Sequence, residues 1–117
     1  MSDRTLERTL LFDFFGDLLT EKQHEYFDLY HNEDLSLSEI AENVGITRQG
    51  VHDIITRAEA ALLAFERKTG IIGRFEEMQE KIVQAQAIAG EIARSAASET
   101  ERERAEGLIS LLNDLKG

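Results

Sequence analysis

Residues 36–63 read SLSEIAENVGITRQGVHDIITRAEAALL, and this stretch decides the fold. Ser36 and Glu39 have the spacing of a capping box, which predicts a short helix that ends at Gly45. Thr47 then stands where a second helix needs its N-cap. Two capped helices joined by a glycine turn are typical of a helix-turn-helix. The second helix carries apolar residues at helical spacing, namely Val51, Ile54, Ile55, Ala58, Leu62 and Phe65.

The residues before this stretch also have helical patterns. Thr20 and Gln23 form another predicted capping box, ahead of an apolar stripe made by Tyr26, Phe27, Leu29 and Tyr30. A first helix that stops near Gly16 carries Leu6, Leu10, Leu11, Phe14 and Phe15. The chain has no proline and no long β-branched run, so we predict an all-α bundle without a sheet. We expect one shared core that contains Ile40, Val44, Ile46, Val51, Ile54 and Leu62.

The C-terminal part predicts a helical hairpin. Gly70 and Gly73 break the preceding helix, which divides the chain into a helix-turn-helix domain over 1–70 and an interaction or oligomerisation element over 71–117. Apolar residues then alternate steps of three and four, at Phe75, Met78, Ile82, Ala85, Ala89, Ile92 and Ala96. Ser98 and Glu101 predict a further capping box, and the last helix is expected to bury Ala105, Leu108, Leu111, Leu112 and Leu115.

The apolar seam formed by these residues from Phe75 to Ala96 predicts a partner helix, and we favour a homodimer. Its expected interface consists of Phe75, Met78, Ile82, Ala85, Ala89, Ile92, Leu108, Leu112 and Leu115. The alternative is that the hairpin folds back on residues 6–30 and covers the seam within one chain.

The amino-acid composition excludes several classes of protein and of functional site. The 117 residues are 42% hydrophobic, carry a net charge of -10 and include no cysteine, which excludes disulfide frameworks and thiolate metal sites. The charged first residues and the lack of a long apolar run predict a cytoplasmic protein without a membrane span. His24 and His31 stand too far apart on one helix to ligate one metal. We therefore expect no metal, no cofactor and no enzymatic activity.

Residues at the start of the helix after Thr47 are the candidate DNA contacts. Arg48 and Gln49 can make paired hydrogen bonds with guanine and adenine edges, respectively. Thr47, His52 and Arg57 are candidates for phosphate contacts. His52 is equally a candidate for contact with a thymine methyl group, Thr47 also serves as a cap, and Arg57 can be an ordinary surface arginine. Residues 47–68 hold four basic and three acidic side chains, a net charge of only +1.

Several of these motifs together resemble the YlxM family, also called UPF0122, a bacterial group with a helix-turn-helix similar to region 4 of sigma factors. The resemblance rests on Leu19-Thr20-Glu21-Lys22-Gln23, on Leu35 to Ala41, and on Thr47-Arg48-Gln49-Gly50-Val51 with Asp53 and Arg57. It implies a small helical regulator that acts in the signal recognition particle pathway and binds DNA through this fold.

Two functions follow as hypotheses. In the first, the chain is a regulator that binds DNA through the helix-turn-helix. In the second, the same fold is an interaction module that binds the signal recognition particle GTPase or its RNA without specific DNA binding. The salt dependence of binding separates them, because phosphate contacts lose affinity steeply as salt is added.

Overall fold

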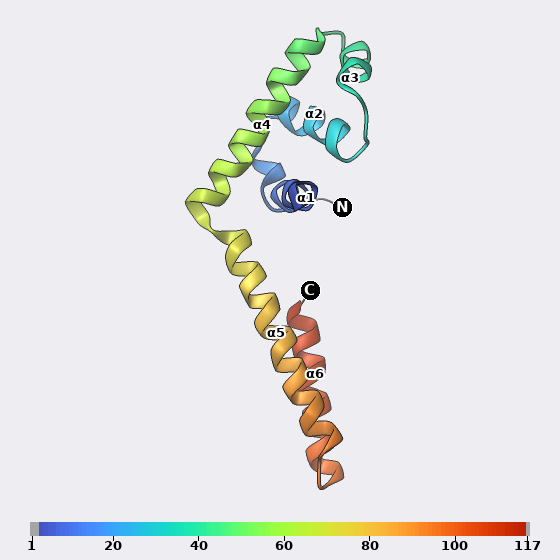
Figure 1. Ribbon diagram of the computed structural model, residues 1–117, viewed down its shortest axis with the longest axis vertical. Coiled ribbons are helices and arrows are strands. Elements are labelled where there is room, and N and C mark those ends of the chain that lie inside the picture. Colours follow the sequence, from blue (N-terminus) through green and yellow to red (C-terminus); the bar gives the residue numbers. More distant parts are fainter. Residues whose placement is uncertain (1–2, 117) are drawn as a thin grey trace. The chain divides into compact units, whose positions relative to one another are not determined.

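The structure is a computed structural model that describes the backbone of residues 3–116 and the side chains of residues 5–116. The described residues form helices and no strand, which confirms the predicted all-α fold (Figure 1). The elements, in chain order, are α1 (Asp3–Phe15), the short 3-10 helix η1 (Gly16–Leu18), α2 (Glu21–His31), α3 (Leu37–Val44), α4 (Arg48–Thr69), α5 (Ile71–Arg94) and α6 (Glu99–Lys116).

Local hydrogen bonds set most of these boundaries. Thr20 accepts from the Gln23 backbone N–H, while the Thr20 N–H donates to the Gln23 side chain, so the predicted capping box is confirmed. Ser36 and Glu39 repeat this arrangement at the start of α3. At α6 only half of the predicted box forms: Ser98 accepts from Glu101 N–H, but the Glu101 carboxylate reaches back to the Ala97 N–H.

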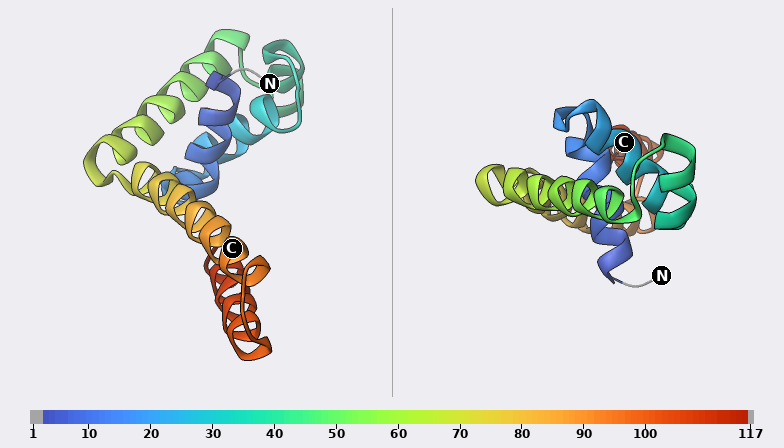
Figure 2. Two further views of the ribbon diagram at one scale, coloured as in Figure 1. Left: turned by 60° about the horizontal axis from the view of Figure 1, so that its bottom comes forward. Right: turned by 90° about the horizontal axis from the view of Figure 1, so that it is seen from above.

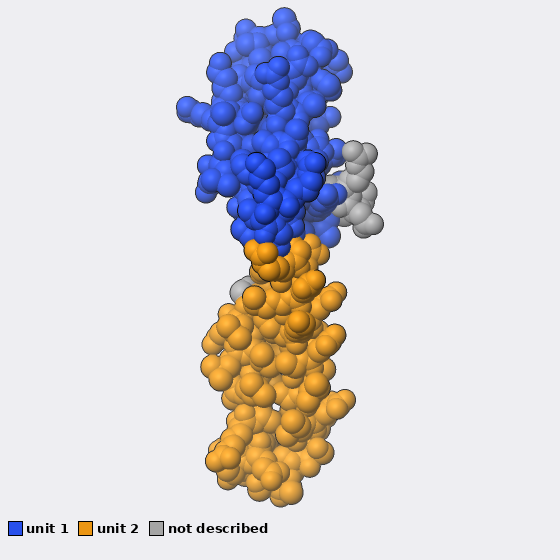
Figure 3. Space-filling model, turned by 90° about the vertical axis from the view of Figure 1, so that its left-hand side faces the viewer, with its two compact units in different colours: residues 1–72 blue, residues 73–117 orange. Residues whose placement is uncertain are grey.

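The chain divides into two compact units, residues 1–72 and residues 73–117 (Figure 3). In the first unit α1, α2 and α3 all pack against the long helix α4, as two further views show (Figure 2). Its core consists of Leu11, Phe15, Tyr26, Phe27, Ile40, Val51, Ile55, Ala58, Leu62 and Ile72. In the second unit α5 and α6 run side by side as a hairpin, and the Gln79 side chain donates to the Lys116 carbonyl at 2.7 Å.

The predicted helix break at Gly73 is wrong. Of these two glycines only Gly70 adopts a left-handed conformation, with φ of 63°, and α5 begins immediately after it at Ile71. The first amides of α5 find acceptors upstream, since Ile72 N–H donates to the Glu66 carboxylate at 2.9 Å and Ile71 N–H donates to the Thr69 hydroxyl. One glycine therefore makes the whole turn, and Gly73 lies inside the helix.

The predicted core of the first unit is correct in part: three of its six residues are buried, two are partly buried, and Ile46 remains 38% exposed. Ile40, Val51 and Leu62 are fully buried, and Val44 and Ile54 pack against them from its edge. Ile46 lies in the turn before α4 and covers the helix end beside Gly50, where a Cβ on that glycine would meet the Ile46 Cδ1 at 3.4 Å. The turn thus holds this side chain outside the core.

Two apolar stripes are buried less completely than their periodicity predicts. In α1 and α2, Leu6, Phe14 and Tyr30 are exposed although their neighbours Leu11, Phe15, Tyr26 and Phe27 are buried. In α6 only Ala105 is buried, whereas Leu108, Leu111 and Leu115 are exposed and Leu112 is half-buried. A single neighbouring helix, α5, covers one side of α6, so the rest of that stripe has no cover within the described unit.

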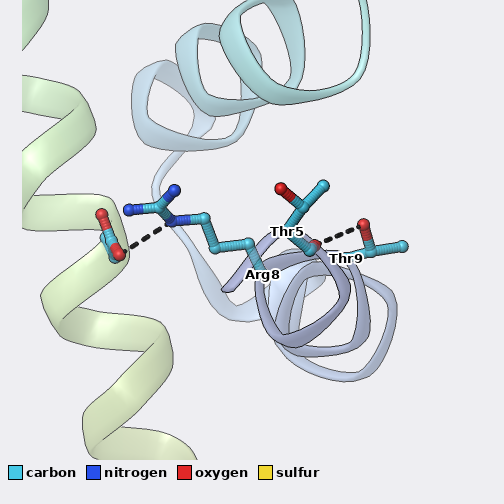
Figure 4. A network of polar contacts seen from close by, with 4 residues as sticks. Thr5, Arg8 and Thr9 are labelled. Carbon is cyan, nitrogen blue, oxygen red and sulfur yellow. Dashed lines mark hydrogen bonds and ion pairs between the residues drawn. The ribbon is translucent and has the colours of Figure 1, made fainter. Parts of the chain in front are cut away.

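An ion pair joins α1 to α4. The Arg8 Nε donates to the Glu59 carboxylate at 3.0 Å, and both side chains are about three-quarters buried (Figure 4). His31, at the end of α2, lies near both groups, and its ring contacts Phe27 and Tyr30. The His31 Nε2 is buried and has no hydrogen-bond partner among the described side chains.

Burial, aided by the nearby Arg8 charge, lowers the pKa of His31, so the folded state disfavours its protonation. The stability that neutral His31 contributes is therefore complete above pH 6.5, the pKa of an unperturbed histidine. It is lost as the pH falls through 6.5 toward the lower pKa of His31 in the folded state. We expect the free energy of unfolding, measured by urea titration, to decline over this range. His31→Phe should make that decline smaller, and an identical decline in both proteins would contradict the expectation.

Candidate nucleic-acid interface

The helix-turn-helix consists of α3, a three-residue turn and the N-terminal part of α4. Gly45 ends α3 with φ of 77°, a left-handed conformation that glycine adopts without a steric penalty. Thr47 caps α4 by accepting from the Gly50 N–H at 3.0 Å. Burial of Ile40 against the α4 residues of the core then holds α3 on α4. The described geometry is the helix-turn-helix that the sequence predicts.

The five predicted contact residues all lie on the solvent side of this motif. Their side chains are exposed, and they belong to the cap and first three turns of α4: Thr47, Arg48, Gln49, His52 and Arg57. The same turns carry the buried residues Val51, Ile55 and Ala58, and Arg48 lies on their side of the helix but is exposed at its first position. The first position of α4 and the side of its first turns that faces away from the core are therefore accessible.

A carboxylate lies in the middle of these residues. The Gln49 side-chain amide donates to Asp53 at 2.9 Å, and the His52 Nδ1 is 3.8 Å from the same carboxylate oxygen. Asp53 therefore orients Gln49 along the surface of α4. Gln49 must release this hydrogen bond before it can present both its donor and its acceptor to a base.

The exposed side of α4 is more positively charged than the net charge of +1 over residues 47–68 indicates. Of the acidic residues in α4, Glu59 pairs with Arg8 and Glu66 accepts from the backbone at the start of α5, so both are engaged within the chain. Arg57, Arg67 and Lys68 are exposed and take part in no ion pair among residues 5–116. Asp53 is the one exposed acid of α4.

Arg67 and Lys68 enter the charge count of residues 47–68 but are not among the contact residues predicted from the sequence. A signal was present, because Lys68 follows Arg57 by eleven residues, which is close to three full turns and places both on one side of the helix. The same spacing places Ala60 and Ala64 between them. These small residues leave a basic stripe along α4 unobstructed.

No group of three or more His, Asp or Glu side chains that could hold a metal exists in the described part of the chain. His24 instead packs its ring against Phe12, with ring centroids 4.8 Å apart. None of the described helices is long and apolar enough to cross a membrane.

Fold and surface together define a helix-turn-helix protein of the all-α class. Comparison with known proteins agrees: a family model described as helix-turn-helix, "YlxM / p13 like", matches residues 2–105. A UPF0122 protein of Thermoanaerobacter sp. (strain X514) is 49% identical over 82 residues, 70% of each chain. One from Shouchella clausii is 37% identical over 115 residues, 98% of this chain and 99% of the relative. The chain belongs to the UPF0122 family of helix-turn-helix proteins, which confirms the resemblance to YlxM.

Proposed function

We propose that this protein is a DNA-binding regulator that presents the first turns of α4 to the major groove. The observation that carries the proposal is the exposed Thr47-Arg48-Gln49 segment, which the turn at Gly45 holds at the N-terminal start of α4. In a helix-turn-helix, the N-terminal residues of the second helix contact base edges while the first helix crosses the backbone. The membership in a helix-turn-helix family supports the same reading.

The side chains divide into two roles. Arg48 and Gln49 read base edges, since each can form two hydrogen bonds with one base. Thr47, His52 and Arg57 contact phosphates and fix the register of the protein on the duplex. The basic stripe continues through Arg67 and Lys68 and adds attraction that does not depend on sequence.

A second candidate function is favoured by one observation, the position of Asp53 among the contact residues. A carboxylate there repels phosphate, as does the net charge of -10. In this reading the surface binds a protein of the signal recognition particle pathway, its GTPase, and regulates that enzyme. The resemblance to YlxM supplies this pathway.

Asp53→Asn separates the two functions. If the surface binds DNA, removal of this charge should raise the affinity for random-sequence duplex DNA several-fold at about 50 mM salt, with a smaller gain at about 200 mM. Fluorescence anisotropy of a labelled duplex measures both affinities. The matched control is Glu25→Gln, which removes one exposed charge from α2 and should change affinity less.

An Asp53→Asn variant with unchanged or weaker DNA binding would contradict the DNA function. If the same variant also binds the signal recognition particle GTPase less tightly than the wild type does, the second function is supported. Circular dichroism of both variants verifies that the helix content is unchanged.

A further inference from the structure

The second unit leaves one apolar side of its hairpin uncovered. We call this the outer hairpin face and define it by Met78, Ile92, Leu108, Leu111 and Leu115, each between 46% and 66% exposed. Ile92 and Leu108 line one groove between α5 and α6, whose floor is formed by Ala89 and Ala105. The hydrogen bond from Gln79 to Lys116 brings the other end of α5 beside the end of α6.

The members of this face lie on one side of the hairpin. Met78 precedes Ile92 by fourteen residues and Leu115 follows Leu108 by seven, which are whole heptads and return each side chain to the same side of its helix. Because α5 and α6 run in opposite directions, the step from Ile92 to Met78 and the step from Leu108 to Leu115 lead the same way along the hairpin. The face is therefore continuous from the groove toward the Gln79 contact.

We propose that a second copy of this chain covers the outer hairpin face, so that two α5–α6 hairpins form an antiparallel four-helix bundle. Two helices can bury a core on one side only, and a second hairpin supplies the missing layer. An isologous contact uses the same surface of both copies and closes without leaving a free apolar edge.

The exposed apolar area of the outer hairpin face agrees with a second copy of the chain as its partner. Five side chains that are about half exposed present roughly 500 Å² of apolar surface, at the upper end of what a soluble monomer shows. A standard interface buries about 800 Å² per partner, of which about 65% is apolar when the interface is that of a homodimer. The face thus has the size that a stable dimer requires.

The charge of the hairpin also favours self-association over contact through the first unit. Residues 73–117 contain nine acidic and six basic side chains, a net charge of -3 out of the -10 of the whole chain. Two hairpins therefore repel each other less than two first units do. Glu101 and Arg104 at the edge of the groove provide both signs of charge next to the apolar residues.

Gly107 indicates where the two copies cross. A Cβ built at this position would meet nothing within 4 Å, so the folded chain itself has no use for a glycine there. Glycine inside a helix is less stable than alanine, but it permits another backbone to approach closely. Gly107 precedes Leu111 by one turn and lies at the border of the outer hairpin face. We infer that α6 of one copy crosses α6 of its partner near Gly107.

Sedimentation of the full-length chain at about 1–100 μM tests the proposal. We expect a dimer for the wild type and at least a tenfold rise in the dissociation constant for Leu111→Glu and for Gly107→Leu. The matched control is Val83→Glu on another side of α5, where Val83 is 48% exposed and should leave the dimer unchanged. Since Leu111 and Gly107 are exposed within one chain, helix content by circular dichroism should stay the same.

The chain has no native cysteine, so Leu111→Cys introduces a single thiol. Oxidation should link two such chains through α6 near the proposed crossing, whereas Val83→Cys should link far less. A wild-type monomer at 100 μM would overturn the proposal. So would a dimer that Leu111→Glu and Gly107→Leu leave intact, or equal cross-linking of the two cysteine variants.

Discussion

Ile40→Ala is expected to lower the free energy of unfolding by about 2–5 kcal/mol. Ile40 is the fully buried residue of α3 and contributes to the core that joins this helix to α4. Truncation leaves a cavity in addition to the lost burial of apolar surface. Because α3 has only eight residues, it has little stability away from this contact, so the helix-turn-helix geometry should weaken first. Urea titration followed by circular dichroism measures the loss.

Two further variants on the same helix test the explanation. Ile40→Val removes one methylene and should cost about 0.5–1.5 kcal/mol. Glu42→Ala changes an exposed residue of α3 and should stay within about 0.5 kcal/mol of the wild type. An Ile40→Ala protein as stable as Glu42→Ala would show that α3 does not depend on this packing.

Arg48→Ala is expected to lose about 1–3 kcal/mol of preference for the cognate DNA site, or roughly 5-fold to 150-fold in relative affinity. Arg48 is exposed at the first position of α4, where a helix-turn-helix meets base edges. The cognate site is first selected from random duplexes with the wild-type protein. Competition between that site and a scrambled duplex then measures the preference of each variant.

Two substitutions separate base reading from general attraction. Arg48→Lys keeps the charge but loses the planar pair of donors, so it should retain overall DNA affinity and still lose preference. Arg57→Ala should weaken binding to all duplexes alike and reduce the salt dependence by about one phosphate contact. If Arg48→Ala binds every duplex as the wild type does, base reading by this residue is excluded.

Sequence patterns predicted much of the site because its geometry depends on neighbours in the chain. The turn at Gly45 and the cap at Thr47 are set by hydrogen bonds that span three or four residues. Helical periodicity accounts for the exposure of Gln49 once Val51 and Ile55 are buried, whereas Arg48 lies on their side of the helix and is exposed at its first position. The charge of the exposed side of α4 was predicted less well, since the sequence count could not reveal that Glu59 pairs with Arg8, fifty-one residues away.

The amino-acid sequence by itself determined the helices, their caps at Thr20, Ser36 and Thr47, and the left-handed glycine turns at Gly45 and Gly70. These features depend on hydrogen bonds and backbone sterics within a few residues, which the local sequence specifies. The tertiary structure decided which sides of these helices are covered. Periodicity marks an apolar stripe on α6, but only the position of α5 decides that Ala105 is buried while Leu108 and Leu111 are exposed. Burial depends on what lies across from a residue, and that neighbour is distant in the chain.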